Sequence, residues 1–243
     1  MTQDIEIITE TIKIPAFDGD AFGAYLAMPK TAGKDAPVPA IIMIQEIFGV
    51  NAEMRKKCDE YAAQGYITIC PDLFWRIEPG IELVDSIEKQ LQRAFELFQI
   101  FDEQTGIEDL KTTLGYIRNH KACNGKVGNI GYCLGGKLSY MLATASDINA
   151  SVSYYGVGIQ DMLDRAQSIK APILLHIAGE DQFVPKDAQD TIMTELADHP
   201  HTGIYRYDGV NHAFARGNGM HYDGPAATLA NQRTHEFLQR NLH

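Results

Sequence analysis

The stretch GKVGNIGYCLGGKLSYMLATA, residues 125–145, decides the expected fold. Its first part predicts a short strand and its last part a helix, and G-Y-C-L-G at 131–135 forms the turn between them. This pattern is typical of a nucleophile elbow in which cysteine replaces serine. Glycines flank such a turn because side chains there would collide with the strand and the helix. Cys133 is therefore the candidate nucleophile, since the start of a helix favours a thiolate. The alternative is a glycine-rich turn around a buried cysteine.

Strand-like and helix-like segments alternate along the chain, which predicts an α/β fold with a mostly parallel sheet and helices on both faces. The unbroken apolar run at 40–44 is typical of a strand that is covered on both sides, and a further strand is expected at 173–178. No composition break divides residues 1–243, so we expect one domain. Further strands are expected at 66–70, 127–130, 150–155 and 203–207, and helices at 51–64, 86–101, 107–120, 136–145, 186–197 and 226–241.

The composition excludes several classes of function. The chain carries a formal charge of −11, and no basic patch is present to bind nucleic acid or an anionic membrane surface. No apolar run is long enough to cross a bilayer, and the N-terminus lacks the pattern of a signal peptide, so we expect a cytoplasmic protein. Cys58, Cys70 and Cys123 show no C-x-x-C spacing and are expected to be small buried side chains with free thiols.

A candidate acid and a candidate base follow Cys133 in the chain. Asp181 comes after the strand at 173–178 in a G-x-D turn, and His212 comes after the strand at 203–207. Active groups of parallel sheets gather at the carboxyl ends of strands, and the order nucleophile, acid, base is that of α/β-hydrolases. We therefore expect Asp181 to orient His212 as the base for Cys133, with Glu180 as the competing acid. Taken singly, Asp181 is a common turn residue and His212 a common structural histidine.

Other residues at the expected strand ends fit the same site. Glu46 directly follows the strand at 40–44 and is expected to face the crevice of Cys133, although a capping or solvated acid is equally open. The backbone amides of Ile47 and Leu134 are the candidate oxyanion donors. Arg216 lies four residues after His212, where its guanidinium is either a carboxylate ligand or a solvated surface group.

The remaining histidines lack comparable support. His176 lies inside an apolar strand and is expected to be a hydrogen-bonded core residue. The sequence offers no set of three converging ligands for zinc, so we expect neither a metal nor a cofactor.

Several blocks in a fixed order resemble the dienelactone hydrolase (carboxymethylenebutenolidase) family. The resemblance runs from about Gly23 to the last helix. It implies a single-domain α/β-hydrolase that opens a cyclic enol lactone bearing a carboxylate, with Cys133 as nucleophile, His212 as base and Asp181 as acid. It also implies that Glu46 pairs with the resting thiol until substrate displaces it, and that Arg216 grips the substrate carboxylate. The blocks are QEIFGVN at 45–51, CPDL at 70–73, GKVGNIGYCLGG at 125–136, YYGVG at 154–158, and the segments 179–185 and 211–216.

One position departs from the family pattern. Well-known members carry a second carboxylate-binding arginine after the CPDL block, where this chain has Leu91. Arg93 and Arg76 lie nearby and are the candidates for that role.

The sequence therefore predicts a hydrolase that opens a carboxylated enol lactone through a cysteine thioester. Its expected partner is a small lactone or ester, and no oligomeric state is predicted. Two alternatives stay open. The first is a carboxylesterase or thioesterase of broad specificity with the same fold. The second is a non-catalytic protein of this fold that binds a carboxylated small molecule or a protein.

Overall fold

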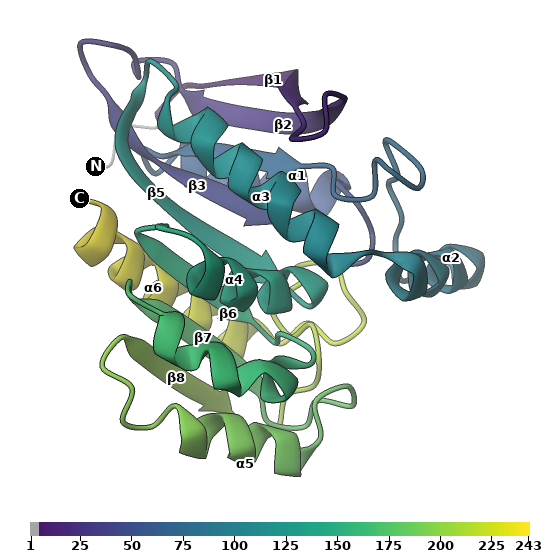
Figure 1. Ribbon diagram of the computed structural model, residues 1–243. Helices are drawn as coiled ribbons and strands as arrows, with labels where there is room; N and C mark the ends of the chain where they lie inside the picture. The colour runs from purple at the N-terminus through teal and green to yellow at the C-terminus, as the bar shows by residue number, and fades with distance from the viewer. Residues whose placement is uncertain (1–4) are drawn as a thin grey trace. The chain divides into compact units, whose positions relative to one another are not determined.

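The computed structural model describes residues 5–243 and has the α/β architecture that the sequence predicts. Eight strands form a mixed sheet, and helices cover both of its faces (Figure 1). The contacts within the chain separate two compact units, whose boundary after Gly128 falls inside strand β5 (Cys123–Tyr132). The single domain expected from the composition stays a prediction.

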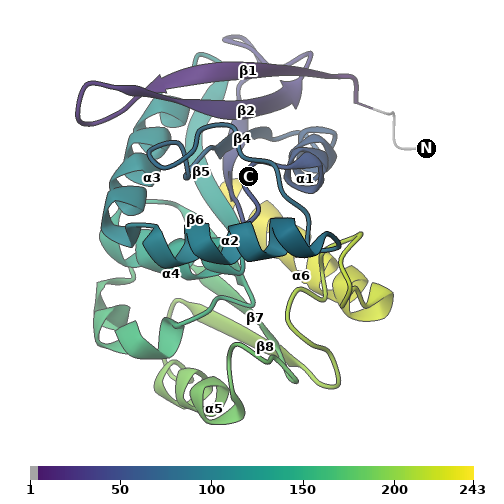
Figure 2. The same ribbon diagram turned by 90° about the vertical axis from the view of Figure 1, so that its right-hand side faces the viewer.

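In the N-terminal unit, the strand order is β1-β2-β4-β3. Strands β3 and β4 are parallel, whereas β1 pairs with β2, and β2 with β4, in antiparallel fashion. Helices α3 and α1 lie on opposite faces of these strands (Figure 2). The bounds are β1 Ile7–Pro15, β2 Ala21–Pro29, β3 Val38–Ile44, α1 Ala52–Ala62, β4 Ile67–Pro71, α2 Glu88–Ile100 and α3 Glu103–Arg118.

The β1–β2 hairpin is absent from the predicted elements. It adds two antiparallel pairings, whereas the β3–β4, β6–β7 and β7–β8 pairings are parallel. Strand β1 lies at the end of the strand order, and Ile14 is its one buried side chain, so its apolar pattern is weak. The turn contains Asp18 and Gly19, and Gly19 has a φ of +98°. An Asp-Gly pair between two short runs is a usual hairpin signal, and it could have revealed this element.

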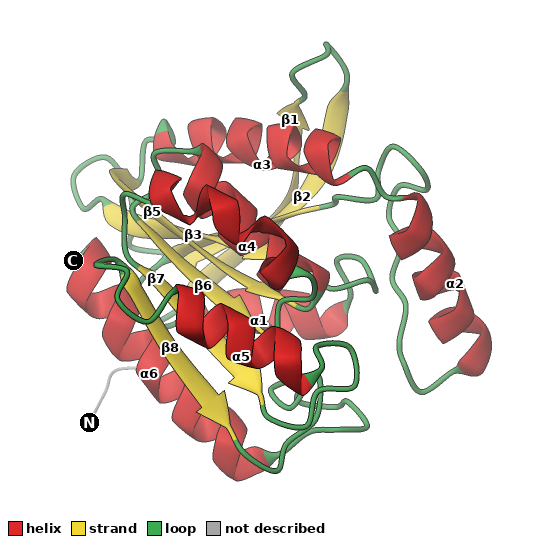
Figure 3. Cartoon of the chain, turned by 60° about the horizontal axis from the view of Figure 1, so that its bottom comes forward, coloured by secondary structure: helices red, strands yellow, loops and turns green. Residues whose placement is uncertain are grey.

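In the C-terminal unit, β6, β7 and β8 are parallel neighbours, and β8 is the last strand of the order. Helices α4 and α5 cover one face of these strands and α6 the other (Figures 2 and 3). Strands β6 and β7 lie where strands are expected and are buried along their whole length. The 3₁₀ helix η1 is absent from the predicted elements. The bounds are α4 Leu134–Ala145, β6 Ala150–Tyr154, η1 Ile159–Ser168, β7 Ile173–Ala178, α5 Lys186–Glu195, β8 Thr202–Tyr207 and α6 Gly224–Leu242.

Two local expectations need correction. Helix α3 begins at Glu103, four residues before the predicted start, because the Asp102 carboxylate accepts the Thr105 N–H at 2.9 Å and caps the helix. Cys123 is half-buried rather than buried, because it is the first residue of β5 and lies at a turn where its Sγ accepts the Gly125 N–H. The burial expected of the other two structural cysteines, at 58 and 70, is confirmed.

A buried polar cluster links β6, β7, β8 and α6. The imidazole of His176 lies 2.8 Å from Tyr207 Oη through Nδ1 and 2.9 Å from Thr234 Oγ1 through Nε2. Thr234 Oγ1 lies in turn 2.7 Å from Tyr154 Oη. The expectation that His176 is a hydrogen-bonded core residue is therefore confirmed. Burial, with a smaller contribution from the charge of Arg233, lowers the pKa of His176 to about 3, so its imidazole is neutral at neutral pH.

We expect His176 to make the protein sensitive to acid. Because its pKa in the folded state lies below the ordinary value of 6.5, the neutral imidazole stabilises the fold fully above pH 6.5, and this contribution is lost as the pH falls toward 3. His176→Gln should lower the free energy of unfolding at pH 7 by about 1–3 kcal/mol, since the amide does not reproduce the positions of the two ring nitrogens that meet the hydroxyl partners. It should also make the decline below pH 6.5 shallower. Urea unfolding at several pH values measures both effects, with the exposed His221→Gln as control. Equal pH dependence in His176→Gln and the unmodified protein would contradict the assignment.

Candidate active site

Cys133 occupies the sharp turn between β5 and α4. Its φ of +57° and ψ of −115° lie in a region that residues other than glycine rarely adopt. The Cys133 N–H donates to the Tyr154 carbonyl at 3.0 Å, which ties the turn to β6. A Cβ at Gly131 would collide with the Gly135 carbonyl, and one at Gly136 would lie 2.5 Å from the Tyr154 carbonyl. The elbow that the pentapeptide predicts is therefore present.

Asp181 and His212 meet from the loops that follow β7 and β8. Asp181 Oδ2 lies 2.8 Å from His212 Nδ1, and the two residues are 6% and 4% exposed. The other carboxylate oxygen, Oδ1, accepts the Phe183 N–H at 2.8 Å, so the loop of Asp181 itself holds the carboxylate in place. Glu180 is exposed, and its carboxylate lies 3.8 Å from Lys186 Nζ. Of the two candidate acids, the structure joins Asp181 to His212.

The charge state of His212 depends on both of its neighbours. Burial alone would lower the pKa of this imidazole, but the charge of Cys133 and hydrogen bonding to Asp181 and Cys133 outweigh burial and raise the pKa to about 10. His212 Nε2 is buried and has no well-aligned hydrogen-bond partner among residues 5–243. Because Cys133 nevertheless raises the pKa of the imidazole, the two side chains are neighbours whose alignment falls short of a full hydrogen bond, as is common before substrate binds. With Nδ1 bound to the carboxylate, Nε2 is the atom that can exchange a proton with the thiol.

Backbone strain gathers at this site. In the described part of the chain, three residues other than glycine have a positive φ: Cys133, Tyr155 at +39° and Ala213 at +64°. Each such conformation costs about 1–3 kcal/mol and persists where the surroundings impose it. The Tyr155 ring meets the His212 ring edge-on at 5.0 Å, and the Phe183 ring does so at 4.9 Å. Neither aromatic residue is among the predicted site residues, and the signal for Tyr155 is its place before Gly156 at a strand end.

Asn211 is a further residue that the sequence analysis misses. Its Oδ1 accepts the Gln182 N–H at 3.2 Å and the His212 N–H at 2.7 Å. This single amide oxygen therefore joins the loop of Asp181 to the loop of His212. Asparagine side chains commonly bind nearby backbone in turns, so an Asn directly before the candidate base is the signal that could have found it.

Glu46 and Ile47 lie in the N-terminal unit, in the turn that follows β3, and both are buried. Gln45 Nε2 donates to the Glu46 carbonyl at 3.3 Å, which helps to shape this turn. Burial lowers the pKa of Lys57, and the charges of acidic residues that include Glu46 oppose that shift. Leu134 is the buried first residue of α4, and the first N–H groups of a helix have no partner inside it. The catalytic roles of Glu46, Ile47 and Leu134 stay predictions.

Arg76 and Arg93, the candidates for a second carboxylate-binding arginine, both bind carboxylates of the chain itself. The Arg76 guanidinium also lies over the Trp75 ring, 4.1 Å from its centroid. Either arginine would have to leave these partners in order to grip a substrate. The partners are Asp18 and Asp109 (Nη2–Oδ1 3.0 Å) for Arg76, and Glu78 (Nη2–Oε2 2.7 Å) and Glu96 (Nη1–Oε2 2.8 Å) for Arg93.

Arg216 is half-buried in the loop that follows His212. Its N–H donates to the Ala213 carbonyl at 3.0 Å, and its own carbonyl accepts the Gly219 N–H at 2.9 Å. Two consecutive turns therefore hold the backbone of Arg216 close to the candidate base. Its binding role stays a prediction.

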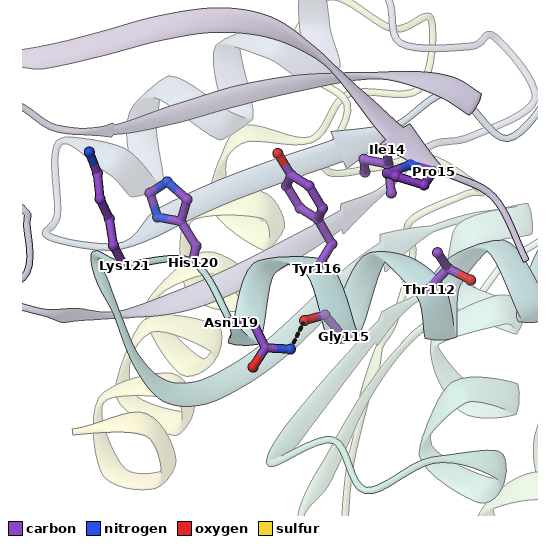
Figure 4. A pocket seen from close by; sticks show the side chains of 8 residues that line it. All are labelled: Ile14, Pro15, Thr112, Gly115, Tyr116, Asn119, His120 and Lys121. Atoms are coloured by element: carbon purple, nitrogen blue, oxygen red, sulfur yellow. Dashed lines mark hydrogen bonds between the residues drawn. The ribbon is translucent and has the colours of Figure 1, made fainter. Parts of the chain in front are cut away.

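A groove between β1 and α3 contains none of the predicted site residues. The side chains of Tyr116, His120 and Lys121 point from α3 and the turn after it toward the hairpin, beside Ile14 and Pro15 (Figure 4). It lacks a nucleophile with an adjacent base, so it is no candidate for the hydrolytic site.

Neither a metal site nor a membrane span emerges from the described residues. Over residues 5–243, no three side chains of His, Cys, Asp or Glu converge in a way that could hold a metal ion. In the same range, no helix combines the length and the apolar character that crossing a membrane requires.

Comparison with known proteins gives matches along nearly the whole chain. The model of the Dienelactone hydrolase family matches residues 22–242. A carboxymethylenebutenolidase of Pseudomonas putida is 40% identical over 232 residues, which cover 96% of this chain and 97% of the relative. A protein of Azospirillum brasilense is 43% identical over 232 residues, or 95% and 98% of the two chains. A crystal structure from Klebsiella pneumoniae, 27% identical, covers 97% of this chain and 99% of that one with a TM-score of 0.83.

Proposed function

Because this chain belongs to the dienelactone hydrolase family, we propose that it opens a carboxylated enol lactone through a thioester on Cys133. The observation that carries the proposal is the 2.8 Å hydrogen bond between Asp181 and His212, next to a cysteine on a strained elbow. The raised pKa of His212 supports an imidazole that holds a proton beside Cys133. Hydrolysis follows from family membership, and the cysteine mechanism is our inference from this geometry.

In the first step, the Cys133 thiolate attacks the lactone carbonyl and a C–S bond forms. The backbone amides of Leu134 and Ile47 stabilise the oxyanion, and each such donor is worth about 2.7–4 kcal/mol in the transition state. The ring C–O bond then breaks. The enolate that leaves stays tethered to the acyl chain and takes the proton of the His212 imidazolium, which leaves the imidazole neutral.

In the second step, water attacks the thioester carbonyl and passes a proton to His212. The C–S bond breaks, the thiolate is restored and a dicarboxylic product leaves. A thiolate is itself a good leaving group. The tetrahedral intermediate formed on a peptide or an unactivated ester therefore expels the thiolate and returns to the substrate. This chemistry therefore favours activated esters and lactones.

Resemblance to the family supports two further roles. Glu46 pairs with the thiol in the resting enzyme, and substrate displaces it. Arg216 binds the substrate carboxylate through its planar guanidinium, which matches a carboxylate in a bidentate pair.

One observation favours a second candidate function, a carboxylesterase or thioesterase of broad specificity. Arg76 and Arg93 both bind carboxylates of the chain, so neither of these two candidates is free to select a carboxylated substrate. Such an enzyme would use the same thioester chemistry on neutral esters.

The two functions are separated by kcat/KM for a dienelactone and for p-nitrophenyl acetate, measured side by side. We expect the lactone to be preferred by at least about 10-fold. Acid quench during turnover, followed by peptide mass spectrometry, should find the acyl group on Cys133. Equal or greater kcat/KM for the neutral ester would favour the broad esterase, and an acyl group on another residue would refute the cysteine mechanism. Absence of hydrolysis of both substrates would favour a binding protein.

Arg216→Ala is expected to raise KM for a carboxylated lactone by about 10-fold or more while changing KM for a neutral aryl ester little. The physical reason is that a charge-assisted pair is lost with the carboxylated substrate alone. Steady-state kinetics on both substrates measure the effect. The control is Arg206→Ala, which removes the arginine of β8 that pairs with Asp190 of α5. A similar rise for both substrates would remove Arg216 from the binding role.

A further inference from the structure

A second hollow, of about 300 Å³, lies in the C-terminal unit where the amino ends of β7 and β8 meet α6. Figure 3 shows α6 running behind these two strands. Residues of the candidate active site follow the carboxyl ends of the same strands. The hollow is therefore separate from the Asp181–His212 pair, and none of the residues placed in catalysis lines it.

Two arginines without carboxylate partners line this hollow. In a chain with 32 acidic and 21 basic residues, neither Arg233 nor Arg240 has a carboxylate within 4.0 Å among residues 5–243. By contrast, Arg206 on the neighbouring strand pairs with Asp190 at 2.7 Å. Arg233 and Arg240 stand seven residues apart on α6, about 10.5 Å along its axis, and therefore share one face of the helix.

Arg233 is held in place for binding an anion. Its guanidinium carbon lies 3.8 Å from the centroid of the Tyr205 ring, and Nη1 donates to Tyr207 Oη at 3.1 Å. The buried His176 fixes Tyr207 in turn. One of the five N–H groups of Arg233 is therefore used, and stacking over a ring leaves the other donors at the edge of the guanidinium.

The remaining walls define what the hollow can accept. Ile173, Leu174 and Phe237 line the same hollow as the two arginines and supply apolar surface. Glu236 also lines the hollow and adds a negative charge, but its Oε1 accepts the Gln232 Nε2–H at 2.9 Å, which holds the carboxylate toward the previous helical turn. Cationic groups with an apolar surface between them suit an organic anion with an apolar body and a carboxylate at each end.

We infer that this hollow binds a small organic dicarboxylate, with one carboxylate on Arg233 and the other on Arg240. The ligand class is a linear acid of about six carbons with conjugated or aliphatic carbons between its carboxylates. Binding here is independent of hydrolysis at Cys133, so the inference stands or falls separately from the proposed function.

The test uses trans,trans-muconate as the probe and the full-length protein with Cys133 blocked by iodoacetamide, so that turnover plays no part. Isothermal titration calorimetry measures affinity, and the Nε–Hε signals of labelled arginine in NMR report which guanidinium groups the probe reaches. We expect Arg233→Gln and Arg240→Gln each to weaken binding by at least about 10-fold. Arg206→Gln is the matched control and should change nothing, and Glu236→Gln should tighten binding.

Three results would overturn the inference. They are no saturable binding at 5 mM probe, equal weakening by Arg206→Gln, or an affinity for inorganic phosphate or acetate as high as that for muconate. Arg233 also contacts the core through Tyr207, so Arg233→Gln could fail to fold. Arg240 is exposed, and the Arg240→Gln variant alone then decides the question.

Discussion

Replacing Cys133 with alanine is expected to lower kcat for p-nitrophenyl acetate by at least about 10³-fold while leaving the fold intact. The nucleophile forms the covalent bond on which both steps depend, so its loss leaves only binding and oxyanion stabilisation. Initial rates measure the effect, and circular dichroism with a thermal melt checks the fold. Cys133→Ser should also be slow, because a hydroxyl does not ionise beside His212 as a thiol does.

Cys123→Ala is the matched control for this substitution. Cys123 lies on the same strand, β5, at its other end, and is half-buried with a free thiol. Its replacement should leave kcat unchanged. Turnover by Cys133→Ala at the rate of the unmodified protein would show that another group is the nucleophile.

Asp181→Asn is expected to lower kcat by about 10²- to 10⁴-fold. The amide can donate a hydrogen bond to His212 Nδ1, which favours the tautomer that carries its proton on Nε2 and cannot accept one there. It should also lower the pKa of His212 from about 10, since the hydrogen bond and charge of Asp181 are among the causes that raise it. In the unmodified protein, the protonated imidazole stabilises the fold fully below pH 6.5, and this contribution is lost as the pH rises through about 10. NMR titration of the imidazole and the pH profile of kcat measure both effects.

Glu180→Gln is the control for Asp181→Asn. The two residues are neighbours, but Glu180 is exposed and faces Lys186. We expect its replacement to change neither kcat nor the titration of His212. If Glu180→Gln costs as much activity as Asp181→Asn, the acid has been assigned to the wrong residue.

The elbow was predictable because its physical demands are local. A strand, a helix and the turn between them require glycine at particular positions, and the collision computed for a Cβ at Gly131 shows why. The alternation of apolar runs with helical periods predicted β6 and β7 in the same way. Asp181 and His212 could be proposed because strand ends of a parallel sheet lie at one edge. Only the hydrogen bond to His212 distinguishes Asp181 from the neighbouring Glu180.

What the sequence does not reveal depends on contacts between distant residues. Arg76 pairs with Asp109, which lies 33 residues away, so no local pattern indicates that its guanidinium is occupied. The ring of Tyr155 reaches His212 from another strand, and its positive φ has no signature in the sequence. The β1–β2 hairpin is hidden because most of β1 faces solvent.

The amide oxygen of Asn211 has a consequence for engineering this enzyme. It accepts the backbone N–H groups of Gln182 and His212 at once, so a single side chain ties together the loops that carry the candidate acid and base. A graft that exchanges only one of these loops for that of a relative would disturb the hydrogen bonds of Asn211 to the other loop. Segments 179–185 and 208–216 are therefore best exchanged as a matched set, with position 211 carried along.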